Sequence, residues 1–127
     1  TVPAFLASTH APIGAISFDL DYYSSTMSAF EIFRDRSILP RVWCYFDDIS
    51  ESPPQSICSR AGERAAINDY NAQHQARMID HDWSLASKQS WHAYQRWADR
   101  IRIWYDLEHA QAEHYVGSAS QQALSLD

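Results

Sequence analysis

Two short apolar runs are the feature of this sequence that most constrains its fold. They are IGAISF, residues 13–18, and RVWCYF, residues 41–46, and each has the length and character of a strand buried in a sheet. Between them, Met27, Phe30 and Phe33 recur at helical spacing, which predicts a helix of about three turns. A strand, a helix and a strand in this order form a right-handed crossover, so the two strands should be parallel. The sequence therefore predicts an α/β fold.

Aspartates follow both runs at the point where each predicted strand ends. Asp19 and Asp21 come after the first strand, and Asp47 and Asp48 come after the second. Because neighbouring parallel strands lie about 4.8 Å apart and end at one edge of the sheet, these carboxylates should share a small volume. Their repulsion favours a divalent cation, and an all-carboxylate site suits Mg²⁺, Mn²⁺ or Ca²⁺ rather than zinc. The alternative is that the aspartates only cap helices or turn the chain.

The remaining segments predict further helices and a second, antiparallel part of the sheet. In chain order they are a helix end or connection over 2–9, an exposed loop over 49–62, a helix over 62–78, a strand over 100–106, its antiparallel partner over 113–117, and a frayed tail over 118–127. Residues 79–99 fit no single pattern, although a helix over 83–97 is one interpretation. Glu63 is interpreted as complementing a helix dipole. Arg100 and Arg102 are expected to face solvent.

Charge and composition exclude several classes of protein. The chain has 127 residues, 46% of them hydrophobic, which is enough apolar material for the core of one domain. Its net charge is −6, so neither nucleic acid nor an anionic membrane is an expected partner. No apolar run approaches the roughly 20 residues of a membrane-spanning helix. Cys44 and Cys58 lack a CxxC spacing and are interpreted as free thiols of a reducing compartment, which predicts a cytoplasmic protein.

Three stretches within residues 13–71 together resemble a known family. They are FDLDYYSSTMSAFEIF, LPRVWCYFDDI and GERAAINDYN, and they are similar to the carboxy-terminal half of the macrocin-type, metal-dependent O-methyltransferases and of related, uncharacterised class I methyltransferase-like proteins. The resemblance implies a partial Rossmann-like sheet whose parallel strands are followed by a carboxy-terminal antiparallel hairpin. It implies that Asp19, Asp47 and Asp48 bind the metal, most plausibly Mg²⁺. Asp21 would be the general base for a hydroxyl of a small molecule or sugar that S-adenosylmethionine methylates.

The glycine-rich turn that binds S-adenosylmethionine in that family is missing from this chain. Its three glycines are Gly14, Gly62 and Gly117, and none of them stands in a GxG arrangement. Residues 1–127 are therefore expected to be a single domain that forms the carboxy-terminal half of a larger methyltransferase-like domain. A chain that begins at Thr1 rather than at a methionine fits that expectation. On its own the chain is not expected to methylate an acceptor.

A half-sheet of this kind would leave residues 13–18 as an apolar, unpaired edge. Such an edge invites pairing with another chain, so a homo-oligomer through this strand is expected. The alternative function is a non-enzymatic α/β domain, in which the aspartates only shape loops and the exposed edge mediates assembly. Metal binding separates the two functions, because the non-enzymatic alternative predicts none.

Overall fold

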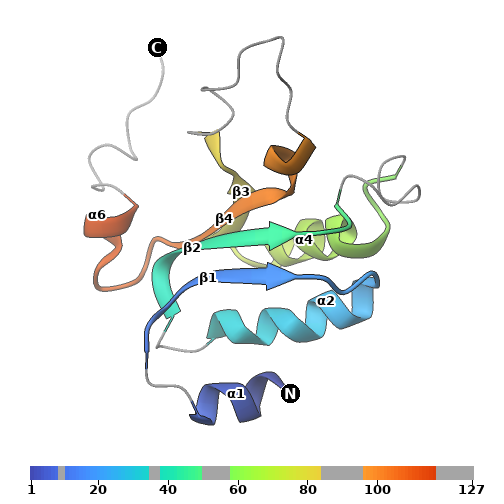
Figure 1. The fold of residues 1–127 in the computed structure, drawn as a ribbon. Helices are drawn as coiled ribbons and strands as arrows, with labels where there is room; N and C mark the ends of the chain where they lie inside the picture. The colour runs from blue at the N-terminus through green and yellow to red at the C-terminus, as the bar shows by residue number, and fades with distance from the viewer. Residues whose placement is uncertain (9–10, 35–37, 50–57, 84–95, 117–127) are drawn as a thin grey trace, which may run out of the picture.

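The computed structural model of the chain describes residues 1–8, 11–34, 38–49, 58–83 and 96–116 (Figure 1). Its elements are α1 (Val2–Ser8), β1 (Ile13–Phe18), α2 (Tyr23–Ala29), the 3₁₀ helix η1 (Phe30–Arg34), β2 (Ile38–Phe46), α4 (Gly62–Gln73), β3 (Arg77–His81), the 3₁₀ helix η2 (Arg96–Arg100), β4 (Ile101–Asp106) and α6 (Ala112–Tyr115). The strand, helix and strand predicted for the first part of the chain are confirmed. None of the described helices has the length and apolar character needed to cross a lipid bilayer.

The strands form one open, mixed sheet in the order β1-β2-β4-β3. β1 and β2 pair in parallel, with Ile16 opposite Cys44 and Phe18 opposite Phe46. β4 lies antiparallel between β2 and β3, so β3 runs in the same direction as β1 and β2. The predicted mixed α/β class and the parallel pair are therefore confirmed. Within the described residues β1 has only one neighbouring strand, which makes it an edge of the sheet.

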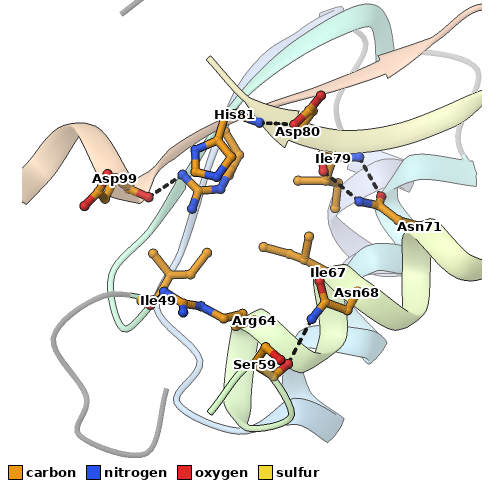
Figure 2. A pocket seen from close by; sticks show the side chains of 11 residues that line it. Ile49, Ser59, Arg64, Ile67, Asn68, Asn71, Ile79, Asp80, His81 and Asp99 are labelled. Atoms are coloured by element: carbon orange, nitrogen blue, oxygen red, sulfur yellow. Dashed lines mark hydrogen bonds between the residues drawn. The ribbon is translucent and has the colours of Figure 1, made fainter. Parts of the chain in front are cut away.

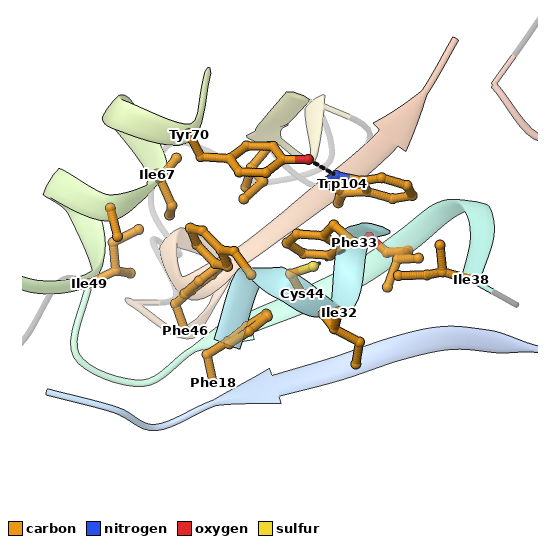
Figure 3. Close-up of a cluster of buried hydrophobic side chains, with 14 residues drawn as sticks. Phe18, Ile32, Phe33, Ile38, Cys44, Phe46, Ile49, Ile67, Tyr70 and Trp104 are labelled. Atoms are coloured by element: carbon orange, nitrogen blue, oxygen red, sulfur yellow. Dashed lines mark hydrogen bonds between the residues drawn. The ribbon is translucent and has the colours of Figure 1, made fainter. Parts of the chain in front are cut away.

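The core lies between one face of the sheet and the helices α2, η1 and α4. Alternate residues of β2, namely Val42, Cys44 and Phe46, are completely buried on this face, while Trp43 between them is 39% exposed on the other. The ring of Phe46 stacks on Phe18 at 4.7 Å between centroids. Figure 3 shows how rings from the strands and the helices meet in this layer. Truncating one such ring to alanine typically destabilises a protein by about 3–5 kcal/mol.

The end of α4 and the strand after it differ from the sequence prediction of a helix over residues 62–78. α4 ends at Gln73, and Arg77–His81 form β3 instead. The side-chain amide of Asn71 explains this change, because its Nδ2 donates to the Ile79 carbonyl and its Oδ1 accepts from the Ile79 N–H, both at 2.8 Å. One side chain of the last helical turn thus holds the returning strand at the sheet.

The predicted hairpin between residues 100–106 and 113–117 is wrong. β4 pairs with β3, with Ile79 opposite Trp104, and Ala112–Tyr115 form the short helix α6. The expectation that Arg100 and Arg102 face solvent is also wrong, because their residues are only 9% and 7% exposed. Arg102 and Trp104 are two residues apart in β4, so both side chains lie on the face of the sheet that packs against the helices. The interpretations for 84–95 and for the tail from 117 on lie outside the described residues.

Candidate metal site

The acidic pairs that follow β1 and β2 lie side by side at one rim of the sheet. The two strands are hydrogen-bonded neighbours, and Figure 1 shows both arrowheads at the same side of the molecule. Their pairing continues one residue past the strands, because the N–H of Asp47 donates to the Phe18 carbonyl at 3.0 Å. The sequence prediction that the two acidic pairs share a rim is therefore confirmed.

Three of the four predicted aspartates converge. Asp19, Asp21 and Asp48 each offer a carboxylate oxygen, and these oxygens lie within 4.8 Å of one another. Oxygens around Mg²⁺ at its usual bond length are about 3.0–4.2 Å apart, and those around Ca²⁺ reach about 5 Å. Asp19 and Asp21 are exposed, so small side-chain rotations can close the remaining difference for Mg²⁺. The residues present thus fit a divalent cation that keeps water ligands on its open side.

The electrostatics of this group favour a positive charge. The pKa of the Asp48 carboxyl is raised, first by a hydrogen bond with Asp21, then by burial and by the charges of Asp21, Asp47 and Asp19. Asp21 also holds a backbone φ of 48°, the left-handed region that Asp tolerates better than most residues. The neighbouring carboxylates therefore disfavour the negative charge of Asp48. A bound cation would remove this repulsion.

Asp47, which was also predicted as a metal ligand, lies outside this group of three. Its Oδ1 accepts hydrogen bonds from Arg100 Nη1 at 2.7 Å and from the Tyr45 hydroxyl at 3.0 Å. Arg100 Nη1 also donates to the Tyr45 oxygen at 2.7 Å. The guanidinium that neutralises Asp47 comes from the end of η2, beside β4. The sequence interpretation missed this pair because it placed Arg100 in solvent.

Glu63 joins the two rim loops from below and is completely buried. Its Oε2 accepts the N–H of Asp48 at 3.2 Å. Burial, with a smaller contribution from the charge of Asp48, raises the pKa of Glu63 to about 7, while backbone N–H groups of Asp48 and Leu20 act in the opposite direction. The carboxyl thus contacts the loop after β1 and the loop after β2. It does more than complement the dipole of α4.

A sequence signal for this role of Glu63 exists. Ala66, Ile67 and Tyr70 follow it at intervals of three, four and seven residues, and all are buried in the structure. An acidic residue at the head of an apolar helical stripe faces the core and needs hydrogen-bond donors there. The two loops at the rim supply those donors through their backbone.

The chain matches no protein-family model, no curated protein and no solved structure.

Proposed function

We propose that this chain is the carboxy-terminal half of a metal-dependent, S-adenosylmethionine-dependent O-methyltransferase that acts on a hydroxyl of a small molecule or sugar. The observation that carries the proposal is the convergence of Asp19, Asp21 and Asp48 from the ends of two neighbouring parallel strands. The carboxyl edge of an open α/β sheet is also where such folds bind their ligands. An antiparallel pair, β3–β4, follows the parallel pair and supports the proposal, although its strands are not those that were predicted to form the carboxy-terminal hairpin.

The three aspartates have distinct roles in this proposal. Asp19 and Asp48 would hold Mg²⁺, which would act as a Lewis acid on the hydroxyl of an acceptor bound beside it. Asp21, at the same site, would be the general base for that hydroxyl. Glu63 keeps the two loops at a fixed separation. Asp47 holds Arg100 at the rim and takes no part in binding the metal.

S-adenosylmethionine does not fit this chain alone. The family resemblance assigns it to a glycine-rich turn, and none of the three glycines stands in such a turn. Methyl transfer would therefore need a cofactor-binding half in addition to these residues. In this proposal the chain supplies the metal ligands, the general base and the binding site for the acceptor.

Calorimetric titration with MgCl₂ and MnCl₂ tests the metal site. We expect one ion to bind per chain, and Asp48→Asn to weaken binding by about tenfold or more, since it removes a charged ligand. Glu31→Gln is the matched control, because it removes an exposed carboxylate that pairs with Arg34, away from the rim. Asp47→Asn should keep the affinity of the wild type. Absence of binding to the wild type, or equal binding by Asp48→Asn, would overturn the proposal.

A non-enzymatic function through the edge strand is the second candidate. The observation in its favour is that β1 has one neighbour in the described part of the sheet and carries no charged residue. Its exposed Ala15 and Ser17 and its half-buried Ile13 and Ile16 lack the charges with which proteins usually guard such edges. Pairing of β1 with β1 of a second copy would give a homodimer. A dimer without metal binding would favour this candidate.

A further inference from the structure

A second site lies beside the rim, in a cavity of about 420 Å³ between α4 and the strands β3 and β4. Figure 2 shows side chains from α4 on one side of this hollow and from β3 on the other. Its walls include the guanidinium groups of Arg64 and Arg102, the imidazole of His81, and the apolar side chains of Ile67 and Ile79. Two guanidinium groups therefore line one cavity of a protein whose net charge is negative.

Arg102 is the more unusual of the two cations, because it is 7% exposed and sits on the interior strand β4. Its Nη1 donates to the backbone carbonyls of Asp99 and Ile101. In the part of the chain that the structure describes, no carboxylate forms a salt bridge with it. Burial lowers the pKa of Arg102, against the opposing charges of Asp99 and Asp80. A buried guanidinium whose hydrogen-bond partners among the described residues are carbonyl groups gains from a further anion.

Arg64 brings a second positive charge to the same cavity from the first turns of α4. Its Nη2 donates to the Ile49 carbonyl at 2.9 Å. The charge of Arg64 lowers the pKa values of both Arg102 and His81, so the three groups lie close enough to repel one another. An anion placed between the guanidinium groups would turn this repulsion into attraction.

The acidic residues of the cavity wall do not fill that position. Both carboxylate oxygens of Asp80 have donors of their own, the His81 N–H at 2.6 Å and Trp83 Nε1 at 3.4 Å. In Figure 2 the carboxylates of Asp80 and Asp99 turn away from the hollow, whereas Arg64 and Asn68 border it. Arg64 and the apolar side chains of Ile67 and Ile79 therefore border the hollow, whereas the two carboxylates in its wall point away from it.

We propose that this cavity binds the anionic group, a phosphate or a carboxylate, of a small molecule, and that Arg102 and Arg64 are its ligands. Planar guanidinium groups bind both kinds of oxyanion through paired N–H donors. Ile67 and Ile79 would contact the apolar part of the same molecule. The cavity adjoins the metal rim, because Arg64 follows Glu63 in α4 and bonds to Ile49, which follows Asp48. The anion site does not depend on the proposed function. The identification of the bound molecule as the acceptor of the methyl group rests on that function.

Titration with sodium phosphate and with sodium acetate, in buffer free of divalent metal, tests the site. We expect saturable binding of at least one anion, with a dissociation constant on the order of 1–10 mM, followed by NMR of the arginine Nε–H signals. Arg64→Gln should weaken this binding by about tenfold, since it removes a charged donor. Arg34→Gln, which removes an exposed arginine at the end of η1, is the matched control and should bind like the wild type.

Arg102 needs two variants because its side chain also holds the backbone. Arg102→Lys keeps the charge without the paired donors and should bind the anion several-fold more weakly while it folds. Arg102→Gln should abolish binding if it folds. Absence of saturable binding to the wild type, or unchanged binding by Arg64→Gln and Arg102→Lys together, would overturn the proposal.

The same titration on Asp48→Asn should give the anion affinity of the wild type, because this site is separate from the metal site. Anion binding by a wild type that binds no Mg²⁺ would refute the proposed function and leave the anion site standing. Metal binding by a wild type that binds neither phosphate nor acetate would refute the anion site and leave the proposed function standing.

Discussion

Replacing Glu63 by glutamine should stabilise this protein at neutral pH and leave its stability in acid nearly unchanged. Glu63 is completely buried, and its pKa is raised to about 7, mainly by burial. The pKa of a glutamate in the unfolded chain is 4.5. Glutamine has the shape of the protonated acid and carries no charge at any pH.

The sign follows from the protons bound by the two states. Below pH 4.5 both states hold the proton, and between pH 4.5 and 7 the folded state holds it while the unfolded state loses it. Wild-type stability should therefore fall as the pH rises through this window and become constant above it. The difference of about 2.5 pKa units corresponds to about 3 kcal/mol.

The variant keeps the observed hydrogen bond, because the Asp48 N–H can donate to the amide oxygen of Gln as it does to Oε2 of Glu63. The net expectation is a variant more stable than wild type by about 3 kcal/mol at pH 8 and about equally stable at pH 4.

Urea unfolding at pH 4, 5, 6, 7 and 8, with EDTA to exclude metal, measures these differences. Glu31→Gln, an exposed carboxylate in a surface ion pair, should follow the wild-type curve. A Glu63→Gln variant whose stability stays parallel to wild type over the whole range would refute the reasoning, because Glu63 would then have the same pKa in the folded protein as in the unfolded chain.

Three further predictions concern the core, the thiols and the edge. Trp104→Phe should destabilise the fold by about 1–3 kcal/mol in urea, since it removes the 2.9 Å hydrogen bond from Nε1 to the Tyr70 hydroxyl and leaves that buried group unpaired. Only Cys58 should react with a thiol reagent in the native state and both cysteines after unfolding, because Cys44 is buried and its pKa is raised to about 12, mainly by that burial. If the edge of β1 mediates assembly, Ser17→Lys should shift the protein from dimer to monomer in light scattering, and a wild type that is monomeric at all concentrations would contradict it.

The first half of the fold could be predicted because its signals are local. The strand, helix and strand up to residue 46 each carry a complete apolar pattern, and the parallel direction follows from the crossover between them. The shared rim of the acidic pairs is a consequence of that direction. These features needed no knowledge of distant contacts.

The second half could not be predicted in the same way, because distant contacts decide it. β3 has only five residues and one fully buried side chain, Ile79, and it exists as a strand through its pairing with β4 and its bonds to Asn71. The alternation in β4 shows which residues share a face but not which face is inside. The stacking of Trp104 on Phe33, at 4.8 Å between centroids, places Arg102 on the buried side.

The convergence of aspartates at the strand ends could be predicted, whereas the partner of Asp47 could not. Asp19, Asp21 and Asp48 could be found because they end the strands, whereas the pairing of Asp47 with Arg100 depends on the distant end of η2. The contacts of Glu63 could not be predicted from its own helix, because Glu63 makes them with the loops after β1 and β2. In both cases the missing information was which charged group of another segment faces the rim.

The most direct test of the metal site is NMR of the ¹⁵N-labelled protein with substoichiometric Mn²⁺, a paramagnetic ion that broadens nearby signals. The geometry predicts that the amide signals of residues 19–22 and 47–49 broaden first and that excess Mg²⁺ restores them. Broadening that begins at other residues, or that spreads evenly over the chain and ignores Mg²⁺, would contradict the claim that these carboxylates form a cation site.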